Sequence, residues 1–318
     1  MWATVPRVKF FNGHEIPLIG LGTYLTKGTA GVKAIKQAID IGYRHIDTAY
    51  RYGNEQDVGR AVRDKLEEGF VKREDLFITT KLWNSFHSPE HVEKAFHRSL
   101  ENLNLNYVDL YLMHMPMGLA FRGYEEQELI SYDSSGRVVC SDVDFCDTWK
   151  AMEQLVYAGK VRSIGVSNFN SSQLSRLLSV SSIKPATNQI ECNPGFTQKP
   201  LIEFCRKLDI TVTAFSPMGR ANRSDSSSQV TANVLTDPEV ATLGAKYGKS
   251  NAQVVLRYLI DIGTIPVPKP SNRCEMLENI DIFDFRLTAE EKALMDRFDN
   301  GKRAVPLKYY SHHRDYPF

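Results

Sequence analysis

The sequence predicts an α/β chain that folds as a (β/α)8 TIM barrel, with an N-terminal β-hairpin, two extra helices and three long loops at its C-terminal mouth. Three observations carry this prediction. Short apolar runs alternate with longer segments of helical period, eight such units follow one another, and no glycine-rich phosphate loop follows the first apolar run. Eight parallel units are the number that closes a barrel.

The first turn signal is the pair Asn12-Gly13, which lies between the apolar segments 8–10 and 16–18. Asn-Gly favours tight turns with positive φ, so we expect the chain to begin with a short hairpin.

The barrel elements are expected in strict alternation. Buried strands are predicted at residues 18–22, 45–48, 76–81, 108–114, 163–167, 187–191, 211–215 and 264–267. Helices are predicted at 30–41, 55–68, 89–103 with Ser88 as N-cap, 145–158, 171–178, 200–208, 238–247 and 252–261, with two more at 274–280 and 288–298. The long loops are 115–144, 217–236 and the tail 300–318. No linker is visible, so residues 1–318 are expected to form one domain.

A doubly wound sheet is the structural alternative. Gly20 and Gly22 begin a G-x-G pattern, but Leu25 stands at the third glycine position, so a Rossmann dinucleotide site is disfavoured. The two glycines are better explained by close packing at one end of the barrel. The polar stretch 220–229 has no core-forming residues and is expected to be mobile or ordered by a ligand.

Composition excludes several classes of function. The formal net charge is +1, with 39 basic and 38 acidic residues, which gives no electrostatic case for nucleic acid or a membrane surface as partner. No long uncharged apolar stretch or signal core is present, so a cytoplasmic protein is expected, as a monomer. The five cysteines show no CxxC spacing, which argues against disulfides and against a metal site.

Four polar residues are placed where barrel enzymes carry their chemistry. Asp47, Lys81 and His114 lie at the carboxyl ends of predicted strands, and Tyr52 follows in the next loop. A buried lysine needs a carboxylate partner, which Asp47 supplies. Its ammonium can lower the pKa of a neighbouring phenol, so we expect Tyr52 to act as a general acid near neutral pH.

Six segments stand in order along nearly the whole chain: GYRHIDTAYRYGNE (42–55), ITTKLWN (78–84), DLYLMHMP (109–116), IGVSNF (164–169), NQIECNP (188–194) and FSPMG (215–219). Together they resemble the aldo-keto reductase superfamily, most closely its aldose-reductase and hydroxysteroid-dehydrogenase branch. The segment LRYLIDIGTIPVPK (256–269) is also similar to reductases of 3-dehydroecdysteroids.

The resemblance implies reduction of aldehydes or ketones, including steroid ketones, by NADPH. Hydride passes from the nicotinamide to the carbonyl carbon while Tyr52 protonates the oxygen, supported by Lys81 and Asp47, and His114 orients the carbonyl. Ser167, Asn168 and Gln189 match residues that bond the carboxamide, and Phe215 matches the stacking ring, usually a tyrosine. Further cofactor contacts are implied for Gly22, Thr23, Asp47, Ser216, Pro217, Met218, Gly219, Glu278 and Asn279.

The segment after the last strand departs from the family pattern. Lys269 matches the lysine that contacts the 2′-phosphate of NADP(H), but Pro270 replaces a serine and Glu275 replaces an arginine. Ser271, Asn272 and Arg273 still offer donors and charge. NADP(H) is therefore favoured, while NAD(H) or dual use also fits this segment.

The expected substrate is a small-molecule carbonyl compound, in a pocket lined by Tyr24, Tyr52, Trp83, His114, Met115, Phe121, Tyr309 and Tyr310. The alternative is a regulatory or structural protein of the same fold that binds the cofactor with little turnover. The complete set of Asp47, Tyr52, Lys81 and His114 favours catalysis over that alternative.

Overall fold

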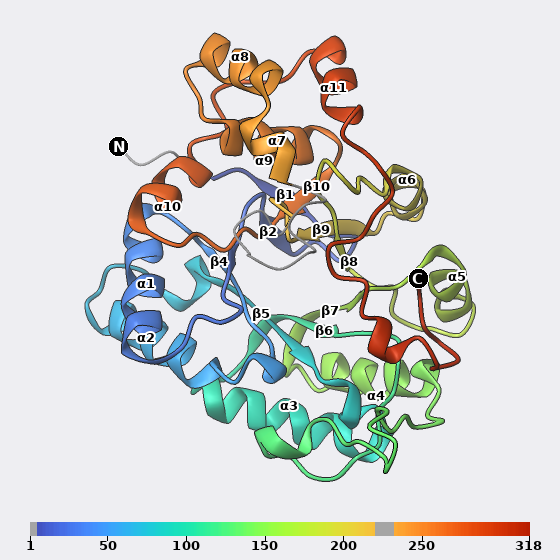
Figure 1. Ribbon diagram of the computed structural model, residues 1–318. Helices are drawn as coiled ribbons and strands as arrows, with labels where there is room; N and C mark the ends of the chain where they lie inside the picture. The colour runs from blue at the N-terminus through green and yellow to red at the C-terminus, as the bar shows by residue number, and fades with distance from the viewer. Residues whose placement is uncertain (1–4, 220–231) are drawn as a thin grey trace.

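A computed structural model describes residues 5–219 and 232–318. Within these ranges, eight parallel strands follow one another around a curved sheet in the order of the chain, and helices cover its outer face (Figure 1). The strands are β3 (Leu21–Gly22), β4 (His45–Asp47), β5 (Phe77–Leu82), β6 (Val108–Met113), β7 (Val161–Ser167), β8 (Thr187–Glu191), β9 (Thr211–Phe215) and β10 (Thr264–Pro266). The predicted (β/α)8 barrel is confirmed.

The helices match the predicted segments closely. They are α1 (Gly28–Ile41), α2 (Glu55–Glu67), α3 (Pro89–Leu103), α4 (Phe145–Tyr157), α5 (Ser171–Leu178), α6 (Lys199–Lys207), α8 (Pro238–Tyr247), α9 (Asn251–Asp261), α10 (Arg273–Ile280) and α11 (Ala289–Asp296). One helix was not predicted, α7 (Ala232–Thr236), which lies within the expected loop 217–236. The polar stretch expected at 220–229 lies outside the described residues.

Two glycines close the barrel. The amide of Gly20 donates to the carbonyl of Pro266 at 3.0 Å, and that of Gly22 donates to Pro268 at 2.8 Å, which joins the first strand to the last. A Cβ atom at Gly22 would lie 2.8 Å from the carbonyl oxygen of Val267. Close packing, and not a phosphate loop, therefore explains the glycine pair, as the sequence predicted.

The N-terminal hairpin seals one end of the barrel. β1 (Arg7–Lys9) pairs antiparallel with β2 (Glu15–Pro17) around the Asn12-Gly13 turn. Phe10 and Ile16 pack in one cluster with strand residues, among them Phe77, Leu110 and Ile265. The hairpin therefore covers the end of the barrel opposite to the carboxyl ends of the strands.

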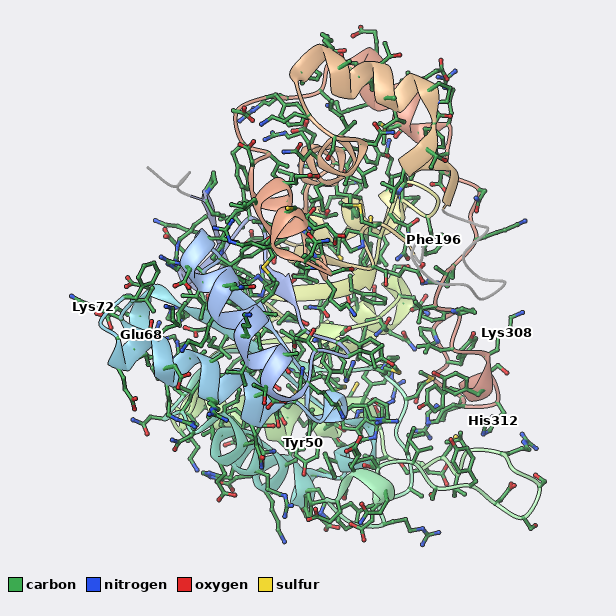
Figure 2. The ribbon with its side chains drawn as sticks, turned by 60° about the vertical axis from the view of Figure 1, so that its left-hand side comes forward. Tyr50, Glu68, Lys72, Phe196, Lys308 and His312 are labelled. Carbon is green, nitrogen blue, oxygen red and sulfur yellow. The ribbon has the colours of Figure 1, made fainter. Side chains whose placement is uncertain are left out.

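The C-terminal tail runs along one side of the barrel, near the carboxyl ends of its strands (Figure 1). Beyond α11 it passes β8, forms the short helix η6 (Lys308–Tyr310), and ends beside α5 (Figure 1). Figure 2 shows Lys308 and His312 on this segment, and the His312 ring lies 2.9 Å from the Val138 carbonyl of the long loop 115–144. Among the described residues, no helix is both long and apolar enough to cross a membrane.

Candidate active site

A buried lysine stands at the centre of the strand ends. Lys81, on β5, is fully buried, and its Nζ donates to Asp47 Oδ1 at 2.5 Å and to the Thr48 carbonyl at 2.8 Å. The same Nζ lies 3.4 Å from the Tyr52 hydroxyl, a third polar contact. Burial opposes the charge, but Asp47 and Tyr52 outweigh it and raise the pKa of Lys81. The ammonium is therefore charged at neutral pH beside the phenol.

Tyr52 is held in place by a short helix and an asparagine network. It ends η1 (Tyr50–Tyr52), directly after β4. Two residues on, Asn54 donates to the carbonyls of Thr23 and Thr26 at 2.8 and 2.9 Å and accepts from the Thr48 hydroxyl at 2.7 Å. Asn54 was not singled out from the sequence, although it lies within a quoted segment. It ties the loop after β3 to the loop that carries Tyr52.

The pKa of Tyr52 differs from the sequence prediction. Burial raises it above the ordinary tyrosine value, and the Lys81 charge opposes this effect without overcoming it. The prediction that Lys81 lowers the pKa of this phenol below its ordinary value is therefore wrong, while the role of Tyr52 as general acid stays a prediction. Tyr52 stays protonated at physiological pH, which is the form that can donate a proton.

His114 completes the group from the end of β6. Its ring lies 5.8 Å from that of Tyr52 and 5.4 Å from that of Trp83, centroid to centroid. Burial, followed by the charges of Lys81 and Arg51, lowers its pKa well below the usual value, so the imidazole is neutral. Its Nδ1 atom is buried without a hydrogen-bond partner among the described residues.

Polar side chains at the ends of β7 and β8 extend this group. Gln189 Nε2, on β8, donates to Asp47 Oδ2 at 2.8 Å, so the carboxylate is held from both sides. The Ser167 hydroxyl donates to the Gln189 carbonyl at 2.8 Å, and Asn168 Nδ2 donates to the His114 carbonyl at 3.0 Å. Asn168 Oδ1 is buried and has no hydrogen-bond partner within the described structure, which leaves one acceptor unused.

The remaining predicted cofactor residues lie around the same rim. Thr23 is buried, and its hydroxyl donates a hydrogen bond to the Asp47 carbonyl at 2.9 Å. After Phe215, Ser216 adopts positive φ and its carbonyl accepts from the Gly219 amide at 2.8 Å, which makes a tight turn over Pro217 and Met218. Arg220 and Arg223, which follow, lie outside the described residues.

The loop between β10 and α10 is exposed. Lys269, Ser271, Asn272 and Arg273 are all on the surface, whereas Asn279 is buried and Glu278 exposed. Glu275 does not point away from this loop. Its carboxylate accepts from the Ser271 amide at 2.7 Å and from Asn272 Nδ2 at 3.0 Å.

Aromatic residues form the outer rim near Tyr52. Tyr24 packs edge-on to Tyr52 at 5.1 Å between ring centroids, and Tyr309 packs against Tyr310 at 4.5 Å. Trp83 and Met115 are buried, and the Trp83 ring packs edge-on to that of His114. Phe121 behaves differently, because its ring contacts are with His91, Tyr124 and Phe86.

Sequence reasoning also missed the residue that anchors the tail. Glu191, at the end of β8, accepts from the amides of Ala304 and Val305 at 2.7 and 3.0 Å. Asn170 and Gln173 of the α5 region donate to the Pro317 and Asp315 carbonyls further along. These partners are far apart in the sequence, so no local pattern indicates them.

Comparison with known proteins identifies the family. The sequence pattern described as "Aldo/keto reductase family" matches residues 18–300. The chain is 43% identical over 317 residues to mouse aldo-keto reductase family 1 member D1, covering 98% of this chain and 96% of that protein. It is 38% identical over 316 residues to mouse estradiol 17 beta-dehydrogenase 5, covering 98% and 97% of the two chains.

Solved structures agree with this result. The aldose reductase from Schistosoma japonicum superposes with a TM-score of 0.90 at 41% identity, covering 98% of each chain. The Bombyx mori aldo-keto reductase, solved in complex with NADP, gives a TM-score of 0.88 at 38% identity, covering 99% of this chain and 100% of that one. The chain therefore belongs to the aldo/keto reductase family, and the prediction of an oxidoreductase acting on carbonyl groups is confirmed at the level of the family.

Proposed function

We propose that this protein reduces aldehydes or ketones to alcohols with NADPH, including bulky ketones of the steroid type. The observation that carries the proposal is the buried group at the strand ends, in which Lys81 contacts both Asp47 and Tyr52 and His114 lies beside the same phenol.

The residues present fit a nicotinamide cofactor. Asn168 Oδ1, buried and unpartnered within the described structure, is an acceptor for a carboxamide N–H, with Ser167 and Gln189 next to it. Phe215 would offer its ring to the nicotinamide, the turn 216–219 and the residues Gly22 and Thr23 would contact the cofactor along its length, and Lys269, Ser271, Asn272, Arg273, Glu278 and Asn279 would contact its adenosine end. When bound, NADPH supplies the hydride that adds to the carbonyl carbon.

Tyr52 supplies the proton. Its hydroxyl is protonated because burial raises its pKa, and the neighbouring Lys81 ammonium stabilises the phenolate that remains after the proton moves to the substrate oxygen. Asp47 keeps the ammonium in position and compensates its burial. The carbonyl carbon gains the hydride and its oxygen gains the phenol proton, so the product is an alcohol.

His114 orients the substrate. Because its imidazole is neutral, the ring can donate one N–H to the carbonyl oxygen without competing with Tyr52 for the role of acid. Tyr24, Trp83, Met115, Tyr309 and Tyr310 then enclose the remainder of the substrate, with Phe121 behind them.

For the protein as a whole, we expect one domain, a monomeric state and a cytoplasmic location, with no nucleic-acid or membrane partner. The rival function, a regulatory or structural protein that binds cofactor with little turnover, is disfavoured because the four polar residues of the centre are all present and in contact.

A panel of carbonyl compounds tests the proposal. Short aldehydes, sugars, aromatic aldehydes and steroid ketones are offered with NADPH and with NADH, and cofactor oxidation is followed at steady state. The proposal expects turnover with NADPH on at least one class. Tight binding of NADPH without turnover on any compound would instead support the regulatory function.

A further inference from the structure

Arg51 brings a positive charge close to the residues that we expect to carry the reaction. It is the middle residue of η1, between Tyr50 and Tyr52, and it is half-buried. Its guanidinium carbon lies 5.6 Å from the centroid of the Trp83 ring, over the face of that ring. The Trp83 ring in turn packs edge-on to that of His114 at 5.4 Å. One aromatic ring therefore links the cation to the histidine that we expect to orient the carbonyl.

The charge of Arg51 acts on both the buried centre and the outer rim. At His114, burial lowers the pKa most, and the charges of Lys81 and Arg51 lower it further. At Tyr309, burial raises the pKa above its ordinary value, and the charge of Arg51 acts against that rise. Arg51 is therefore close enough to interact electrostatically with the reacting groups and with the tail residue that we expect to enclose the substrate.

Within the part of the chain that the structure describes, no acidic residue pairs with Arg51. Its guanidinium has neither an ion-pair partner nor a hydrogen-bond partner there. Other charges near this loop are already balanced, since Lys81 pairs with Asp47, and Lys27 pairs with Glu126 at 3.3 Å. A half-buried cation without a counter-ion is suited to bind an anionic group of a ligand.

We propose that Arg51 determines substrate specificity in this chain, by favouring carbonyl compounds that carry a carboxylate at the end remote from the carbonyl. The inference rests on the proposed function, because it places the substrate carbonyl beside Tyr52 and His114. A guanidinium that lies over an aromatic face keeps the donors along its edge free, and two of them can bind both oxygens of a carboxylate. The substrate would extend from the buried centre along Trp83, and its acid group would bind Arg51.

A purely structural role for Arg51, as a cover for the Trp83 ring, predicts something different. Loss of a cation–π contact would change the position of Trp83 and affect every substrate alike. The ratio of kcat/KM for an acid to kcat/KM for its methyl ester separates the two roles. Both compounds have the same carbonyl group and the same chain, so any effect on the reaction itself cancels in this ratio.

Steady-state kinetics with NADPH and a homologous series of ω-oxo carboxylic acids, each beside its methyl ester, tests the inference. The wild-type protein should prefer the acid at the chain lengths that reach from the centre to Arg51. Arg51→Gln should lower the acid-to-ester ratio about fivefold to tenfold at low salt, because a charge-assisted contact is lost. Arg51→Lys keeps the charge and should retain most of the ratio. High ionic strength should reduce the ratio in the wild-type protein, since a half-exposed ion pair is screened.

The control is Arg60→Gln, which removes the same charge from an exposed position on α2 and should leave the ratio at its wild-type value. The inference is overturned if the wild-type protein turns over no acid of the series or does not distinguish acid from ester. It is also overturned if Arg51→Gln leaves the ratio unchanged, or if Arg60→Gln lowers it equally. These results leave the proposed function in place. Only a protein that turns over no carbonyl compound at all would overturn that function, so the two failures are distinguishable.

Discussion

The centre around Lys81 and the loop between β10 and α10 lie at the same end of the barrel but are held in opposite ways. Lys81 and Asp47 are buried, and their bonds join β4, β5 and β8 across the sheet. The polar groups of the loop are exposed, and the bonds of Glu275 reach no further than Ser271. We infer that substitutions in the centre change chemistry and folding together, whereas substitutions in the loop change affinity alone.

The largest effect is expected from Tyr52→Phe, because it removes one hydroxyl and nothing else from the centre. Loss of a general acid should lower kcat by ~10²–10⁴-fold. Affinity for NADPH, measured by titration, should stay within about twofold, since the phenol acts on the substrate oxygen.

Tyr50→Phe is the matched control. Tyr50 begins the same short helix, and its hydroxyl bonds the Tyr124 carbonyl and Arg98, away from Lys81. This variant should keep wild-type kcat. A Tyr52→Phe enzyme with near-normal turnover would remove the phenol from the mechanism.

The next largest effect is expected from Lys81→Met, which should change both the catalytic rate and the stability of the fold. Breaking a buried ion pair by removing one partner costs about 3–5 kcal/mol, so the free energy of unfolding should fall clearly. The charge that opposes burial at Tyr52 is also lost, so the pKa of Tyr52 should rise further. Alcohol oxidation needs the phenolate as base, and its rise with pH should therefore shift to higher pH in the variant.

Lys65→Met provides the comparison. Lys65 is also a largely buried lysine, on α2, paired with Asp40 and Glu68 outside the site. Its removal should lower stability and leave the pH profile of oxidation where it was. If both variants gave the same pH profile, Lys81 would be a structural residue only.

His114→Gln should have a smaller effect than either of these. It replaces one hydrogen bond to the carbonyl oxygen, so kcat/KM should fall by about tenfold to a hundredfold. The wild-type protein offers a second measurement. Because burial and the charges of Lys81 and Arg51 hold the pKa of His114 well below its ordinary value of 6.5, kcat/KM for a neutral ketone should show no histidine inflection near pH 6.5. A loss of activity centred near pH 6.5 would contradict the neutral imidazole.

The comparison between the two regions also shows what the sequence could predict. Asp47, Lys81 and His114 were found because barrel geometry brings strand ends together, and the structure places them in one group. Helix α3 begins at Pro89 with Ser88 at the N-cap position, as predicted, because a serine followed by a proline is a local signal for the start of a helix.

Effects that depend on the assembled fold were not predicted. The pKa of Tyr52 is set mainly by burial, which is a property of all the surrounding elements and of no single neighbour. Glu191 anchors tail residues more than a hundred positions away in the sequence. Glu275 was noted only as the replacement of an arginine, and its hydrogen bonds with the Ser271 amide and Asn272 Nδ2 appear only in the folded loop.

The smallest effect is expected at the rim, where the tail lies near the carboxyl ends of the strands. Tyr309 is 59% exposed on η6, and the backbone beside it is fixed by Tyr310, which is 1% exposed. Tyr309→Ala therefore removes an aromatic surface without releasing the tail. A bulky ketone that loses roughly 50 Å² of apolar contact, at about 25 cal/mol per Å², should show a KM increased several-fold, up to about tenfold.

Short aldehydes do not reach this ring, so their KM should stay unchanged, and kcat should be preserved for both substrate classes. Tyr157→Ala is the matched control, because Tyr157 is 62% exposed at the C-terminal end of α4, the end that faces away from the carboxyl ends of the strands. An equal rise in KM for large and small substrates, or the same rise in the Tyr157 variant, would show that Tyr309 does not select substrates by size. A rise in KM for the bulky ketone alone would show that the exposed rim determines which substrates bind, whereas the buried centre carries out the reaction.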